Sequence, residues 1–142
     1  MKRAFGVTCG AALLLSVITA PLTAHAAGAD AAAYRQAVAK AAEFLQTKAQ
    51  AADGSYSAAT GPGVTCVVTA GLLRSGRSAD DPAVAKSLKY LEGLVQPDGG
   101  IYQQGSFYAN YETCLAMLCF AEANRDGRYE KLLKNAERFV KG

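Results

Sequence analysis

Four groups of side chains in this 142-residue chain are of types that could do chemistry. They are the thiols of Cys66, Cys114 and Cys119, the neighbouring acids Asp80 and Asp81, the aromatic cluster of Phe107, Tyr108 and Tyr111, and the single acid Glu112 in an apolar segment. Thiols can pair or attack, aromatic faces can hold an apolar ligand or a cation, and a buried carboxyl can carry a raised pKa. Which of these roles is open depends on the elements that position the groups.

The first 26 residues have the pattern of a secretory signal. Lys2 and Arg3 precede an apolar core at residues 9–20, and small residues at Ala24 and Ala26 favour cleavage after position 26. A permanent membrane anchor is the weaker alternative, because the apolar run is shorter than the roughly 20 residues that a bilayer requires. We therefore expect an exported protein, periplasmic or secreted, with a mature chain of residues 27–142 and no stable membrane anchor.

Cleavage would remove His25, the one histidine. A mature chain without histidine has no Ser-His-Asp or Cys-His catalysis and no histidine-containing zinc site of its own. The full chain carries 15 basic and 12 acidic residues, and cleavage removes Lys2 and Arg3 but no acid, which leaves a net charge of +1. The mature chain is thus nearly neutral, and it has no basic tract that could bind nucleic acid or anionic lipid.

The remaining sequence predicts helices of two kinds. Amphipathic helices are expected at residues 34–50, 82–95 and 128–142, because apolar residues recur there every three or four positions. Residues 64–73 and 111–124 are apolar on all sides, so they are expected to be enclosed on most sides. Asp30, Asp81 and Asn110 are the predicted helix N-caps. The simplest arrangement is two layers, with amphipathic helices outside and apolar helices inside.

The chain also repeats itself with a period of roughly 46 to 49 residues. Residues 40–56 align with residues 86–102 without a gap, and Thr65-Cys66 aligns with Thr113-Cys114. The shared motif positions are Gln50, Gly54 and Tyr56 in the first copy and Gln96, Gly100 and Tyr102 in the second. We predict one repeat at residues 34–76, a second at 82–124 and the start of a third at 128–142.

This motif resembles the QW repeat of the squalene–hopene cyclase and protein prenyltransferase superfamily, over most of the mature chain. It departs from the cyclase pattern because Tyr56 and Tyr102 stand where tryptophan is usual. The resemblance implies an all-α fold of stacked helical hairpins, a partial α/α toroid of about two and a third repeats. It also implies that the six motif residues are structural: the glutamine ties off an outer helix and the aromatic ring stacks on its neighbour.

The resemblance permits a check of the family's chemistry. Cyclases use an Asp-x-Asp-Asp acid, and the nearest sequence here, residues 78–81, lacks the first aspartate and is better explained as a helix cap. Prenyltransferase zinc needs a histidine, and a thioester needs a Cys-Gly-Glu-Gln sequence that no cysteine here begins. We therefore expect no catalytic residue, no metal and no cofactor.

Two alternatives stay open for the cysteines and for the aromatic loop. Cys66 and Cys114 would occupy equivalent places on adjacent inner helices, so they could form a disulfide, or each could be a small buried apolar residue. In a toroid, Phe107, Tyr108 and Tyr111 would lie near the cavity mouth, where they bind a ligand or cover a helix end. Glu112 either faces the cavity or lies in a first helical turn, where the helix dipole favours a negative charge.

Two functions follow as hypotheses. The first is an exported, non-catalytic helical-repeat protein that acts as a binding or assembly module, with an apolar small molecule as candidate ligand and self-association through the uncapped third repeat. The alternative is a partial chain or subunit of a terpene cyclase-type enzyme acting on an apolar isoprenoid substrate. An Asp-x-Asp-Asp sequence in a longer gene product would favour the enzyme.

Overall fold

The computed structural model describes residues 30–142, and the predicted signal at residues 1–26 lies outside this part. The described residues are mostly helical and contain no strand, which confirms the predicted all-α class. One isolated bridge pairs Val95 with Ile101 within a loop.

Five α-helices alternate along the chain as the sequence predicts. They are α1 (Ala31–Phe44), α2 (Gly63–Arg74), α3 (Pro82–Glu92), α4 (Ala109–Ala123) and α5 (Glu130–Lys141). A π-helical turn, Leu45–Ala49, extends α1, and a short 3-10 helix, Ala58–Thr60, precedes α2. Asp30 and Asp81 cap α1 and α3 by accepting backbone N–H groups of Ala32 and Ala83, as predicted.

The prediction that Asn110 caps the fourth helix is wrong. The helix begins at Ala109 with Tyr108 in the N-cap position, so Asn110 lies inside the first turn. The first turn is fixed instead by Thr113, whose hydroxyl donates to the Ala109 carbonyl at 2.7 Å. Sequence signals locate a helix start more easily when the cap is an acid followed by proline, as at Asp81-Pro82.

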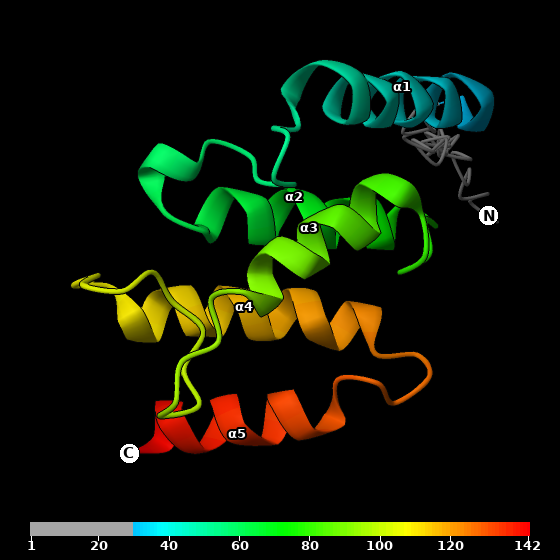
Figure 1. The fold of residues 1–142 in the computed structure, drawn as a ribbon. Coiled ribbons are helices and arrows are strands. Elements are labelled where there is room, and N and C mark those ends of the chain that lie inside the picture. Colours follow the sequence, from blue (N-terminus) through cyan, green and yellow to red (C-terminus); the bar gives the residue numbers. More distant parts are fainter. Residues whose placement is uncertain (1–29) are drawn as a thin grey trace, which may run out of the picture.

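Helices α2 and α4 lie side by side at the centre of the molecule (Figure 1). Helix α1 lies beyond α2, α5 lies beyond α4, and α3 crosses in front of the central pair and packs on α2. The core between them is built from buried aliphatic and small residues, with Phe120 its largest side chain. This arrangement covers the sides of α2 and α4 that lie toward α3, which is favourable because neither helix has a continuous polar face.

The expectation that both apolar helices are enclosed on most sides is only partly right. Val64 and Val67 on α2, and Tyr111 and Leu118 on α4, are exposed large apolar side chains. They are three residues apart on α2 and seven residues apart on α4, so each helix presents an apolar face to solvent. The sequence pattern shows that these helices lack a polar face, but the described residues supply covering elements for only part of their surface.

Candidate functional site

The exposed face of α2 and α4 contains a groove between the two helices, which we call the α2–α4 groove. It has a volume of about 240 Å³ and is lined by Cys66, Val67, Ala70, Gly71, Arg74, Leu115 and Leu118. Arg74 and Glu122 form an ion pair of 2.7 Å between the helices, next to the groove. The lining is otherwise apolar, so the groove suits an apolar group better than a charged one.

Aromatic side chains lie at the N-terminal end of this face. Tyr111, in the first turn of α4, is 63% exposed and lies near the start of α2, where a Cβ added at Gly63 would be 3.9 Å from its ring. Tyr108 is also exposed, and Phe107 is 100% exposed. The structure therefore brings Tyr111 to the apolar face but leaves Phe107 without a neighbouring ring, and the three do not form a closed cage.

Glu112 is buried but does not face the groove. One carboxylate oxygen accepts the Gln103 N–H at 2.9 Å, and the other accepts the Ser106 hydroxyl at 2.7 Å. It lies in the first turn of α4, one of the two positions that the sequence left open. The carboxylate holds the loop before α4 onto the helix, which leaves it little capacity to act on a ligand.

Two loops of the protein share one hydrogen-bonding pattern. Tyr56 donates its N–H to the Thr65 hydroxyl at 2.9 Å, and Ile101 donates its N–H to the Thr113 hydroxyl at 3.0 Å. Both threonines are fully buried. Thr65 and Thr113, which the sequence alignment matched, therefore have the same structural role. Each threonine accepts a backbone N–H that would otherwise be buried without a partner.

The gapless alignment of the loops is one residue out. The structural equivalent of Tyr56 is Ile101 rather than Tyr102, because these two residues bond to the threonines. In the same way Gly54 corresponds to Gly99 rather than Gly100: both have positive φ, and each approaches a carbonyl of the next amphipathic helix, α3 or α5. The sequence alignment was misled because Gly100 and Tyr102 repeat the residue types of Gly54 and Tyr56.

The remaining motif residues join loops to helices. The Gln50 side chain donates to the Ala83 carbonyl at 2.7 Å and to the Ser87 hydroxyl at 2.9 Å, so it fixes the first loop to α3. The Gln96 side chain donates within its own loop, to the Tyr102 carbonyl at 2.9 Å. Tyr102 is half-buried and stacks on Phe139 of α5, with ring centroids 5.5 Å apart.

All three cysteines of the described residues are free thiols. Cys66 is buried and Cys114 is exposed, so the alternative of a disulfide between them is not realised in this structure. Burial raises the pKa of Cys66 to about 12 and raises the pKa of Cys119 as well. These two thiols are consequently protonated at neutral pH and unreactive.

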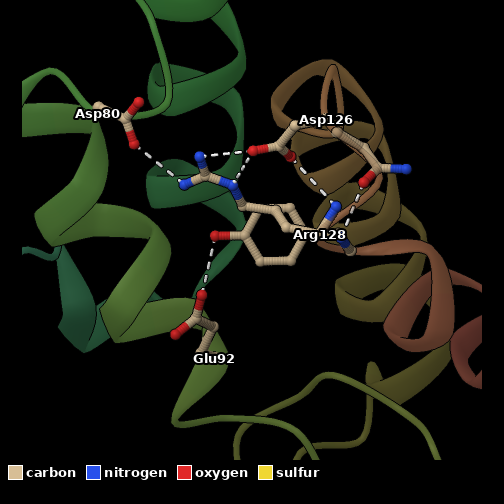
Figure 2. Close-up of polar contacts among 6 residues, drawn as sticks. Asp80, Glu92, Asp126 and Arg128 are labelled. Atoms are coloured by element: carbon tan, nitrogen blue, oxygen red, sulfur yellow. Dashed lines mark hydrogen bonds and ion pairs between the residues drawn. The ribbon is translucent and has the colours of Figure 1, made fainter.

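Both acids before α3 have structural partners, and Figure 2 shows those of Asp80. Asp81 caps α3 and accepts from Arg77 at 2.7 Å. Asp80 pairs with Arg128 at 3.1 Å, and the same guanidinium binds Asp126 at 2.7 Å. Sequence reasoning missed Arg128, since nothing in the local sequence indicates that the turn before α5 lies beside Asp80.

Nearby, Tyr129 joins three helices. Its hydroxyl donates to Glu92 at the end of α3, with a distance of 2.9 Å (Figure 2). Its ring packs at 4.7 Å from the ring of Phe120 in α4. Burial, followed by the hydrogen bond to Glu92, raises the pKa of Tyr129 well above its usual range. This tyrosine is a structural residue rather than a candidate acid.

Two broader features complete the description of the site. Among residues 30–142, no three potential metal ligands are grouped closely enough to hold an ion. None of the helices that the structure describes combines the length and apolar character needed to cross a bilayer. Comparison of the chain with models of protein families, with curated proteins and with solved structures gives no match.

Proposed function

We propose that this protein is an exported helical-repeat module of the terpene cyclase and prenyltransferase-like type, and that it binds an apolar partner through the exposed face of α2 and α4. The face is the single observation that carries the proposal. A small soluble domain rarely leaves several large apolar side chains on adjacent helices uncovered unless the surface has a partner.

The repeat assignment is supported by the two matching loops. Each one places a glycine with positive φ against the next amphipathic helix and ends on a backbone N–H held by a buried threonine. Each is followed by an apolar helix, α2 or α4. Two units built on the same local contacts, followed by the amphipathic helix α5, are what a shortened array of helical hairpins requires.

A non-catalytic role is supported by the partners of the candidate acids. Asp80 and Asp81 bind arginines, and Glu112 binds two donors of its own loop. Oxygens that already accept hydrogen bonds within the protein have few lone pairs left for a ligand. The chemistry expected of the face is therefore binding by apolar contact.

Self-association remains a prediction, but α5 is a poor surface for it. Its exposed side carries the ion pairs Glu130–Lys134 and Glu137–Lys141. A charged surface of this kind is suited to solvent and can end a helical array. The apolar candidates for a contact with a second copy or with an apolar small molecule are instead on α2 and α4.

The experiment is to place charge on the face without disturbing the core. Val67 and Leu118 are both more than half exposed, so V67D and L118D should leave folding nearly unchanged. We expect the double variant to weaken self-association and binding of the neutral probe phenylnaphthylamine by at least about tenfold, because burying one such side chain contributes about 1.5–3 kcal/mol. Sedimentation velocity and probe fluorescence measure the two effects.

The matched control is F44D, which charges an equally exposed apolar residue on α1. It should leave association and probe binding as they are. The proposal is overturned if F44D has the same effect as the double variant, or if the double variant has none.

A further inference from the structure

We propose that a second groove, between α1 and α2, binds a single-chain amphiphile with an anionic head group, such as a fatty acid. The groove is distinct from the α2–α4 groove, although the two share Gly71 and Arg74. The inference does not depend on the proposed function, because it concerns a different ligand and a groove that α2 forms with α1 instead of with α4.

The floor of this α1–α2 groove is apolar. A hollow of about 340 Å³ is lined by Val38, Ala41 and Ala42 of α1, by Leu45 of the π-helical turn, and by Val68 and Leu72 of α2. Of these helix-α1 residues only Ala42 is buried, so α1 does not close tightly onto α2. Tyr34 and Leu45 are eleven positions apart on the helix, which gives the groove a length of about 16 Å. That length suits an alkyl chain.

The groove is continuous with a polar hollow of about 330 Å³ at one end, since both contain Tyr34, Val38, Ala42, Arg74 and Ser75. This second hollow adds Arg35 and Arg77 to the lining, and neither hollow has an acidic residue in its lining. Volumes of this size lie in the range of about 300–1,000 Å³ found for small-molecule sites.

Three arginines thus gather at the end of an apolar groove. Arg35 has no ion-pair partner among the pairs formed by residues 30–142. Arg74 and Arg77 each use a single nitrogen, on Glu122 and Asp81 respectively. Since a guanidinium has five N–H donors, both retain donors for a carboxylate. An apolar tail and an anionic head complement the two parts of this site.

Gly71 provides a sharp test of the groove. It lies within α2, is exposed, and a Cβ built on it would meet nothing within 4 Å. G71L therefore fills the groove with a side chain and replaces a glycine that weakens the helix. We expect it to weaken dodecanoate binding at least tenfold while the thermal midpoint stays the same or rises. L118S, which changes only the α2–α4 groove, should leave dodecanoate binding intact.

The head-group site is tested by R35Q, measured by titration calorimetry with dodecanoate below its micellar concentration. We expect binding about five- to tenfold weaker than in the unchanged protein, because a charge-assisted hydrogen bond is lost. R138Q, at an exposed arginine of α5, should have no effect. Dodecanol and dodecylamine should bind at least about tenfold more weakly than dodecanoate, and each methylene removed from the acid should weaken binding about fourfold.

The proposal is overturned if dodecanoate does not bind, if dodecylamine binds equally well, or if G71L binds as the unchanged protein does. Equal losses in R35Q and R138Q would show a diffuse charge effect and would also overturn it. Binding to phosphatidylglycerol vesicles without binding of dodecanoate would identify a membrane surface as the ligand in place of a free amphiphile. If dodecanoate binds while the V67D/L118D variant behaves like the unchanged protein, this inference stands and the proposed function fails.

Discussion

At the scale of single residues, two glycines show how closely the loops approach the helices. Gly54 has a φ of +97° and a Cβ added to it would overlap the Lys86 carbonyl oxygen of α3. Gly99 has a φ of +92°, and its Cβ would lie 2.8 Å from the Asn135 carbonyl oxygen of α5. Both positions therefore require glycine for two reasons: the positive φ, and the lack of room for a Cβ beside the helix carbonyl.

These two requirements can be separated by comparison with Gly76. Its φ is +99°, yet a Cβ there would meet nothing within 4 Å. We expect G76A to cost about 1–2 kcal/mol of unfolding free energy, the cost of the backbone angle alone. G54A should cost about 1–3 kcal/mol more, because α3 must also move away.

Urea denaturation followed by circular dichroism measures both variants. Equal losses for G54A and G76A would contradict the tight packing of the first loop against α3. G99A should resemble G54A if the two loops play the same role against α3 and α5.

At the scale of elements, Tyr129 holds the ends of α3, α4 and α5 together. Its hydrogen bond to Glu92 joins residues that are 37 positions apart in sequence, and its ring also contacts Phe120 of the preceding helix. Because burial raises the pKa of Tyr129 in the folded protein, folding favours the protonated phenol. The stability that follows is complete below the ordinary tyrosine pKa of about 10 and is lost as pH rises through the folded value.

We therefore expect the unfolding free energy to fall as pH rises above about 10, and Y129F to make that fall shallower. Some slope should remain, because burial also raises the pKa of Tyr56 and Tyr90. Thermal unfolding at a series of alkaline pH values measures the slope.

The control for this measurement is Y34F, at an exposed tyrosine of α1. It should keep the slope of the unchanged protein. A Y129F slope equal to that of the unchanged protein would show that Tyr129 titrates in the folded state as it does in the unfolded state.

At the scale of the whole molecule, stability should be unevenly distributed. The central pair α2 and α4 contributes most of the buried side chains, whereas α1 has a single buried residue, Ala42. Segments with few buried apolar contacts open at a lower free energy than the core. We expect amides of α1 to exchange with solvent at least about tenfold faster than the amides of α4.

Hydrogen exchange followed by mass spectrometry checks this order, with peptides from α4 as the internal reference. Equal protection of α1 and α4 would mean that the molecule opens as one unit. Saturation with dodecanoate should slow exchange in α1 selectively if the α1–α2 groove is occupied, since a ligand stabilises the state that binds it.

The element order was predictable because it depends on local patterns. Apolar spacing located the helices, and Asp81-Pro82 marked a helix start within one residue. The register of the second loop was not predictable, because Gly100 and Tyr102 imitate the residue types of the first loop. The registers are distinguished by two features of the structure, the hydrogen bond from Ile101 to Thr113 and the positive φ of Gly99.

The residues that line the α2–α4 groove were not predicted as ligand-binding residues, since none of the four predicted positions is among them. Tyr111 was expected near a binding surface and does lie on the apolar face, whereas Phe107 stands alone in solvent. Glu112 was a candidate from its apolar surroundings, yet two loop donors occupy its carboxylate. These outcomes depend on where neighbouring loops fold, which the residue types alone do not specify.

The sequence by itself determined the helical class and the order of amphipathic and apolar helices, because periodicity and caps are local properties of the chain. The tertiary structure alone decided which faces of α2 and α4 stay uncovered, that Arg128 meets Asp80, and that three arginines gather beside the α1–α2 groove. Those features arise from contacts between residues distant in sequence, and their geometry is set by how the helices pack rather than by any one of them.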